Sequence, residues 1–147
     1  MFKYTKEHLQ GNNLSIGIFE GPMAGGGEIK YSTSNYEDGI PLYLNFPDEF
    51  AETIKNSGIN YVSTANNHLW DKGIEGAFRT LDVLDKYNIS HIGSYRNENE
   101  KEKKELQIIN VNGVKIAFLS YTKIINALHI KIRKFLNPHS SNIEKIK

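Results

Sequence analysis

The chain has 147 residues and a mass of 16.7 kDa, the usual size of one domain, and its 39% hydrophobic residues suffice for a buried core. A formal net charge of +1 argues against a dedicated nucleic-acid-binding protein, and the lack of cysteine excludes disulfides, thiolate zinc sites and a cysteine nucleophile. No apolar run approaches the roughly 20 residues that span a bilayer, and the first residues lack the apolar region of a signal peptide. As written, the sequence predicts a cytoplasmic chain with no transmembrane segment and no nucleic-acid partner.

The balance of charge changes sign near residue 122. Residues 123–147 hold six basic residues and one acid, a net +5, whereas residues 1–122 carry −4. This contrast predicts a folded domain over 1–122 and a basic tail over 123–147. Apolar residues at positions 124, 125, 128, 132 and 136 could form an amphipathic helix for a membrane surface or a partner, but a poorly ordered tail is the favoured interpretation.

A strand and a helix are the first predicted elements. The apolar run over 14–19 ends at Glu20-Gly21-Pro22, as a strand entering a turn does. Residues 23–45 are rich in Gly, Ser, Asn and Tyr and predict a long loop. A helix is then expected from Pro47, with one apolar face and a stop at Gly58.

The next elements alternate between strand and helix. A β-branched and aromatic run over 59–64 predicts a buried strand, and a polar loop over 65–73 follows it. Apolar residues recur at helical spacing over 74–84, with Asn88 as the expected cap, and 89–93 forms a third predicted strand.

The last predicted elements form a hairpin. The charged segment 96–105 is expected to be a solvated loop or helix, and the strands 106–111 and 114–120 flank Asn112-Gly113, a strong turn signal. The order β-loop-α-β-α-β-β predicts an α/β fold with a mixed sheet.

Polar side chains follow the first two predicted strands. Glu20 comes after the first strand, and Asn67, His68 and Asp71 come after the second. Ligands of open α/β sheets bind beyond the carboxyl ends of the strands, and these oxygen and nitrogen donors suit Mn²⁺, Fe or Zn²⁺. The alternative interpretation is an Asn-rich turn whose side chains cap the next helix, and composition alone favours it.

Several stretches in order also resemble a known family. From about Leu14 to Thr122 the chain is similar to the middle of the bacterial capsule-synthesis CapA family, the poly-γ-glutamate capsule biosynthesis proteins, which resemble calcineurin-like metallophosphoesterases. The matching stretches are residues 18–22 (IFEGP), 44–51 (LNFPDEFA) and 63–68 (STANNH), then Asp71, Gly73, Gly76, Thr80, Leu81, Ile89, Gly93 and residues 117–122 (AFLSYT).

The resemblance implies roles for four residues. Asn67 would offer its side-chain oxygen to a metal, and His68 beside it would act as an acid or donate a hydrogen bond to substrate oxygens. Glu20 would hold the place of the acidic residue that follows the second metal-binding strand, and Asp71 would orient the His68 loop. A divalent metal such as Mn, Fe or Zn is therefore implied, bound weakly because ligands are missing.

The family pattern extends past both ends of the match. An earlier strand carrying Gly-Asp and later histidine motifs have no counterpart, and His129 and His139 match neither motif. Ile18 also stands where the family commonly has Asn. The implied fold is thus a partial metallophosphoesterase-like α/β sandwich, incomplete at both ends, and the expected function is capsule or poly-γ-glutamate biosynthesis by a truncated, catalytically incomplete copy.

The remaining expectations concern partners and bystander residues. The substrate class implied is a small anionic or polyglutamate-related molecule, and an open sheet edge is expected to favour self-association. Family members are often exported or membrane-anchored. The alternative function is a non-enzymatic module that binds a ligand or partner on the same scaffold. His91 is expected to be a packed or edge histidine, and Trp70 a packing residue.

Overall fold

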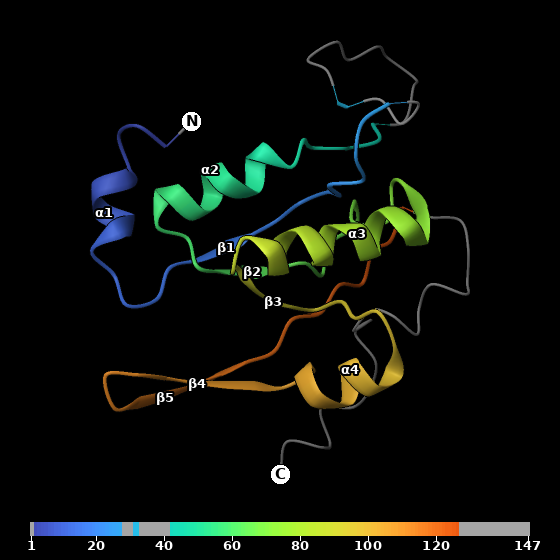
Figure 1. The fold of residues 1–147 in the computed structure, drawn as a ribbon. Coiled ribbons are helices and arrows are strands. Elements are labelled where there is room, and N and C mark those ends of the chain that lie inside the picture. The colour runs from blue at the N-terminus through green and yellow to red at the C-terminus, as the bar shows by residue number, and fades with distance from the viewer. Residues whose placement is uncertain (1, 28–30, 33–41, 127–147) are drawn as a thin grey trace.

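The computed structural model describes residues 2–27, 31–32 and 42–126, so most of the predicted basic tail lies outside the described residues. Helices and strands alternate through most of this part of the chain (Figure 1). The elements are α1 (Lys6–Gln10), β1 (Ile16–Ile18), α2 (Glu49–Ser57), β2 (Tyr61–Ser63), α3 (Gly73–Lys86), β3 (Ser90–Ile92), α4 (Glu98–Lys104), β4 (Gln107–Val111) and β5 (Val114–Phe118).

The strands form two separate sheets among the described residues. β1, β2 and β3 pair in parallel in that order, with Gly17 opposite Val62 and Val62 opposite His91. β4 and β5 form an antiparallel hairpin across Asn112-Gly113, as predicted. The α/β class is confirmed, but the prediction of one mixed sheet is wrong, because the hairpin packs against the face of the parallel sheet and does not extend it.

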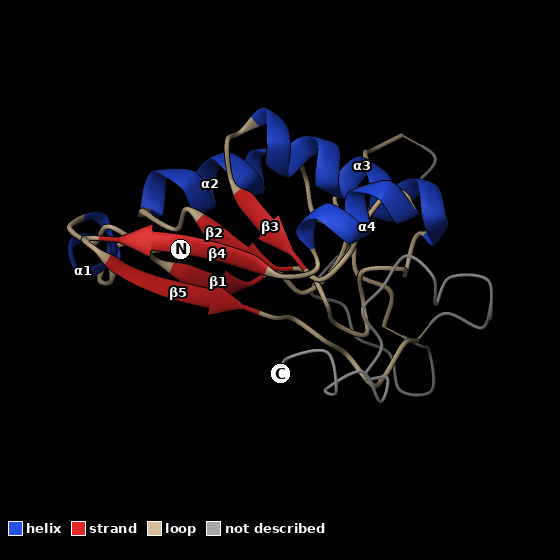
Figure 2. Ribbon diagram, turned by 90° about the horizontal axis from the view of Figure 1, so that it is seen from below, coloured by secondary structure: helices blue, strands red, loops and turns tan. Residues whose placement is uncertain are grey.

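Alternating side chains of β2 point to two different layers. Val62 packs with residues of α2 and α3, whereas the Tyr61 ring lies 4.9 Å from the ring of Phe118 on β5. Figures 1 and 2 show the same arrangement, with α2 and α3 on one side of the sheet and the hairpin on the other. The central strand is therefore buried on both faces, as a parallel strand requires.

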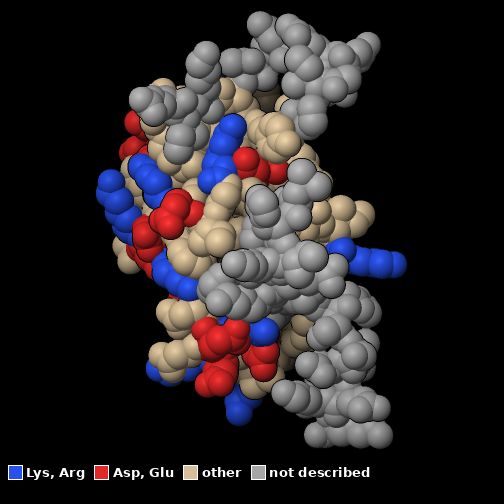
Figure 3. Space-filling view, turned by 90° about the vertical axis from the view of Figure 1, so that its right-hand side faces the viewer, with Lys and Arg blue, Asp and Glu red and all other residues tan. Residues whose placement is uncertain are grey.

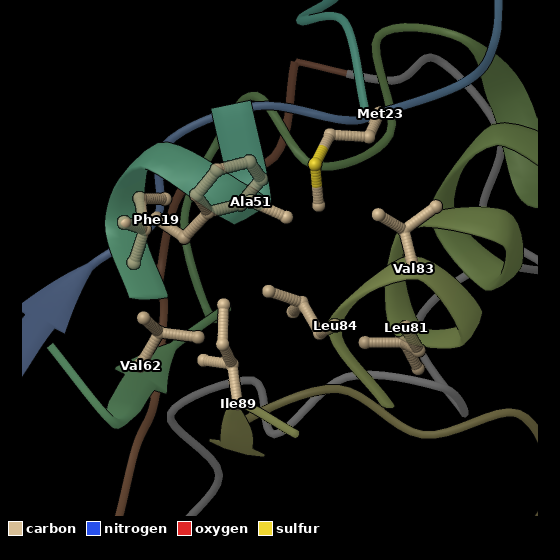
Figure 4. Close-up of a cluster of buried hydrophobic side chains, with 9 residues drawn as sticks. Phe19, Met23, Ala51, Val62, Leu81, Val83, Leu84 and Ile89 are labelled. Carbon is tan, nitrogen blue, oxygen red and sulfur yellow. The ribbon is translucent and has the colours of Figure 1, made fainter. Parts of the chain in front are cut away.

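The main core lies between the parallel sheet and its two covering helices. Nine buried hydrophobic residues form it, and Figure 4 shows most of them converging from the strands, α2, α3 and the segment after β1. They are Phe19, Met23, Ala51, Ile54, Val62, Leu81, Val83, Leu84 and Ile89. The apolar periodicity of the two helices thus predicted their buried faces.

Chain turns at the helix ends depend on positive φ angles. Asn88, with φ of 53°, follows α3, and the amides of Asn88 and Ile89 donate to the carbonyls of Asp85 and Leu84. This is the pattern of a Schellman cap, and it gives the predicted role of Asn88 a geometry. Gly58 ends α2 with φ of 100°, and a Cβ there would lie 2.7 Å from the carbonyl carbon of Leu9 in α1, a helix that the sequence did not predict.

Candidate functional site

The candidate site lies in the loop between β2 and α3. This loop leaves the carboxyl end of the central strand, the edge at which open α/β sheets bind ligands. The loop is compact, because the Asp71 amide donates to the His68 carbonyl and the Gly73 amide donates to the Trp70 carbonyl. The turn therefore presents its side chains from a defined backbone.

Asn66 holds this loop against the end of β1. Its side chain is 8% exposed, and its Nδ2 donates to the carbonyls of Phe19 and Thr64, at 2.7 and 3.2 Å. Its Oδ1 accepts the amides of His68 and Leu69, both at 2.9 Å. Asn66 therefore caps a turn within the loop and does not cap α3, whose N-cap residue Lys72 makes no side-chain cap bond.

His68 and Asp71 form a hydrogen-bonded pair. His68 Nδ1 lies 2.7 Å from Asp71 Oδ2, and the two side chains are 15% and 0% exposed. Asp71 Oδ2 also accepts the Leu44 amide at 2.7 Å, whereas Asp71 Oδ1 is buried with no hydrogen-bond partner in the described part of the chain. The orienting role expected for Asp71 therefore has a direct geometric basis, although the catalytic role of the pair stays a prediction.

Asn67 sits at the surface end of the same loop. It is half-buried, its Nδ2 lies 3.4 Å from Asn126 Oδ1, and its carbonyl accepts the Asn126 amide at 3.1 Å. The Asn126 side-chain nitrogen is 3.2 Å from His68 Nδ1. Sequence reasoning missed Asn126, because no local pattern distinguishes it within the segment that follows the hairpin.

Glu20 follows β1 and is exposed. It lines an apolar groove with Ile18 and Phe46, and in the described residues it shares no hydrogen bond with Asn67, His68 or Asp71. Across residues 2–27, 31–32 and 42–126, no group of three His, Asp or Glu side chains is placed to hold a metal ion. The structure brings His68, Asp71 and Asn67 together, and a shared ion between Glu20 and Asn67 stays a prediction.

A second asparagine missed by sequence reasoning connects the loop after β1 to the site. Asn45 is 1% exposed, its Oδ1 accepts the Ala24 amide at 2.8 Å, and its Nδ2 donates to the Gly25 carbonyl at 2.9 Å. The preceding amide, that of Leu44, is the one that Asp71 accepts. The matching stretch 44–51 contained this residue, but only the tertiary contacts reveal that it holds two loops in register.

An ion pair joins α3 to the start of α2 and to the loop after β1. Arg79 donates through both terminal nitrogens to the Asp48 carboxylate, at 2.7 and 2.8 Å, and to the Met23 carbonyl at 2.7 Å. The hydrogen bond from Arg79 holds the pKa of the Asp48 carboxyl below its usual range. On the face shown in Figure 3, basic and acidic side chains lie interspersed among the visible residues.

His91 and Trp70 are packed residues, as expected. His91 on β3 is 4% exposed and its Nε2 lies 3.1 Å from Asp85 Oδ1, while burial lowers its pKa. Trp70 is 2% exposed and packs in a small cluster with Leu69 and Ala77. His91 on β3 and Trp70 within the loop are thus both packed residues.

Comparison with known proteins identifies the family of the chain. The profile of a family described as "Bacterial capsule synthesis protein PGA_cap" matches residues 1–145. The chain belongs to this family. It is 27% identical over 123 residues to the "Capsule biosynthesis protein CapA" of Bacillus anthracis, and 26% identical over 124 residues to the "PGA biosynthesis protein CapA" of Bacillus subtilis (strain 168).

The PGA_cap chain is much shorter than these relatives. The alignments cover 83% and 84% of this chain but only 28% and 31% of the two relatives. The family match continues past residue 122, and the domain boundary expected there stays a prediction. Within the described residues, none of the helices combines the length and apolar character needed to cross a membrane.

Proposed function

We propose that this PGA_cap chain contributes a metallophosphoesterase-type site to capsule or poly-γ-glutamate biosynthesis, acts on a small anionic or polyglutamate-related substrate, and is catalytically incomplete alone. The observation that supports the proposal is the loop after β2, in which Asn66 holds the backbone in place while the side chains of Asn67 and His68 stay partly accessible. Family membership supports the link to capsule biosynthesis.

The His68–Asp71 pair provides the chemistry of the proposal. Because the carboxylate of Asp71 can only accept when ionised, it favours the tautomer in which Nδ1 of His68 carries the proton. Nε2 is then the atom that can accept a proton from, or when protonated donate one to, a substrate oxygen. The Leu44 amide on the same Asp71 oxygen holds the carboxylate, and through it the imidazole, in one orientation.

The described residues do not fit a complete metal site. Asn67 offers one amide oxygen and Glu20 one exposed carboxylate, and no group of three His, Asp or Glu side chains gathers around either in the described ranges. A two-metal site needs several donors for each ion. The hydrolytic activity of this chain is therefore expected to be low.

A metal titration of the 147-residue chain tests the proposal. Calorimetry with Mn²⁺ and Zn²⁺ should detect weak binding. Asn67→Ala should lower the association constant at least five-fold, and His91→Ala should leave it unchanged. Hydrolysis of bis-p-nitrophenyl phosphate should not exceed the rate in buffer containing the same metal. Equal losses in the two variants would refute the loop assignment, and Mn²⁺-dependent turnover that Asn67→Ala abolishes would refute incompleteness.

A non-enzymatic binding module is the second candidate. The donor set described above favours it, because no acidic or histidine cluster for a metal is found in the described part of the chain. Binding of a short poly-γ-glutamate in the presence of EDTA, unchanged by His68→Gln, would favour this candidate over the first. Binding that requires Mn²⁺ and is lost in Asn67→Ala would exclude it.

A further inference from the structure

The outer edge of β1 is open among the described residues. β1 ends the order β1-β2-β3, so only β2 pairs with it in the parallel sheet. The Phe19 amide donates to Ser63, and the Ser15 carbonyl accepts from Tyr61, so the odd-numbered residues direct their backbone groups toward β2. Successive residues of a strand alternate, and Ile16 and Ile18 therefore direct their N–H and C=O groups to the open edge.

The side chains along this edge are apolar and accessible. Ile16 is 50% exposed and Ile18 is 76% exposed. Both lie on the hairpin side of the sheet, because they are in register with Tyr61, which contacts Phe118, and with Ser63, which is bonded to Ser120. On the helix side, Gly17 opens an apolar groove of about 320 Å³. The groove is lined mainly by Phe2, Phe46, Phe50, Ile54 and Ile59.

We infer that β1 is a dimerisation strand, and that a second copy of this chain pairs with it antiparallel about a two-fold axis at Gly17. This register sets each Ile16 opposite the partner's Ile18, and the two pairs exchange four backbone hydrogen bonds that use every outward group of these residues. Gly17 then faces its symmetry mate in a non-hydrogen-bonded pair, with Cα atoms about 4.5 Å apart. The two apolar grooves then meet across the axis, and each buries the apolar surface of the other.

Charge supports the antiparallel direction. Glu20 lines the groove at the carboxyl end of β1, whereas Phe2 adjoins a shallow hollow with Lys3 and Lys6 at the amino end. An antiparallel partner brings the acidic end of each groove toward the basic end of the other. The strand itself, Ile16-Gly17-Ile18, carries no charge that would oppose pairing.

A cysteine placed on the axis tests the register. The chain has no cysteine, and a Cβ at Gly17 would meet only the Ile59 side chain, at 3.6 Å, so Gly17→Cys is compatible with the fold. The expected Cα separation lies within the 4.4–6.8 Å range of disulfides, and mild oxidation should convert most of the variant to a covalent dimer. Gly11→Cys, where a side chain meets open space, is the control and should remain monomeric on a non-reducing gel. Equal cross-linking of the two variants would overturn the register.

Sedimentation of uncross-linked protein tests the association itself. Ile18→Lys should raise the dimer dissociation constant at least ten-fold, because it places a charge at the edge. Ile108→Lys, at a 62% exposed position on the hairpin, should not. A monomer at all concentrations up to about 1 mM would overturn the proposal. So would slow hydrogen exchange of the Ile16 and Ile18 amides in a monomer, since another segment of the same chain would then cover the edge.

Discussion

Two adjacent asparagines are expected to lose very different amounts of stability on the same substitution. Asn66→Ala removes the hydrogen bonds from Nδ2 to Phe19 and Thr64 and those that Oδ1 accepts from His68 and Leu69. Each such bond contributes roughly 0.5–1.5 kcal/mol net, and a buried group left without a partner adds to the loss. We expect the free energy of unfolding to fall by about 3 kcal/mol.

Asn67→Ala is the matched control. The Asn67 side chain is half-exposed and has one long contact, 3.4 Å to Asn126, so its removal should cost less than about 0.5 kcal/mol. Urea unfolding followed by circular dichroism measures both changes, and the melting temperature of Asn66→Ala should fall by roughly 10 °C. Losses within 1 kcal/mol of each other would refute the division of roles between the two residues.

Asn66→Asp separates the two halves of the clamp. Aspartate keeps an acceptor for the His68 and Leu69 amides but sets an oxygen against the Phe19 and Thr64 carbonyls. We therefore expect this variant to be destabilised as well, and to regain stability when the new carboxylate is protonated in acid. Stability equal to wild type at pH 7 would mean that the two donated bonds contribute nothing.

Three further outcomes follow from burial, backbone angle and charge. Burial lowers the pKa of His91, so near pH 6.5 and below the unfolded chain binds a proton that the folded chain does not. The free energy of unfolding should therefore decrease as the pH falls from 7.5 to 5.5. In urea unfolding over this range His91→Gln should lose less stability than wild type, and an equal loss would contradict this cause. Gly58→Ala should lower the free energy of unfolding by about 2 kcal/mol, because the glycine has φ of +100° and a Cβ would meet the α1 backbone at 2.7 Å. The control Gly11→Ala, where a Cβ meets open space, should leave the melting temperature within about 1 °C of wild type. Arg79→Gln removes the hydrogen bond that lowers the pKa of Asp48, and a carboxyl NMR titration should show that pKa rising; no change would mean that another group controls it.

Local patterns predicted most elements of the fold. The apolar spacing over 74–84 corresponds to α3, Asn112-Gly113 lies at the hairpin turn, and the strand over 59–64 contains the central β2. These predictions succeed because helix and strand periodicities are written in neighbouring residues. The same patterns could not distinguish a mixed sheet from two packed sheets, since that choice depends on Tyr61 meeting Phe118 across the layers.

The candidate site divides in the same way. The spacing of His68 and Asp71, three residues apart in one loop, is a property of the sequence, and the structure joins them at 2.7 Å. Asn66 and Asn67 look equivalent in the sequence, yet only the contact with the Phe19 carbonyl makes one of them a clamp. Glu20 shows one limit of the sequence, because a position at the end of a strand does not determine which neighbours its side chain contacts. Asn126 shows another, because no local pattern marks a residue that reaches the loop only in the folded chain.

Local sequence patterns therefore indicated most of the elements, the family resemblance and the residues at the carboxyl ends of the strands. Only the folded chain shows which layer the hairpin joins, how Asn45 connects the Gly25 loop to the segment that binds Asp71, and which edge of the sheet is open among the described residues. The difference lies in how far along the chain each kind of interaction acts. Hydrophobic periodicity and turn propensity act over a few residues, whereas buried hydrogen bonds and packed rings join residues more than 20 positions apart, and their partners are fixed only when the whole core closes.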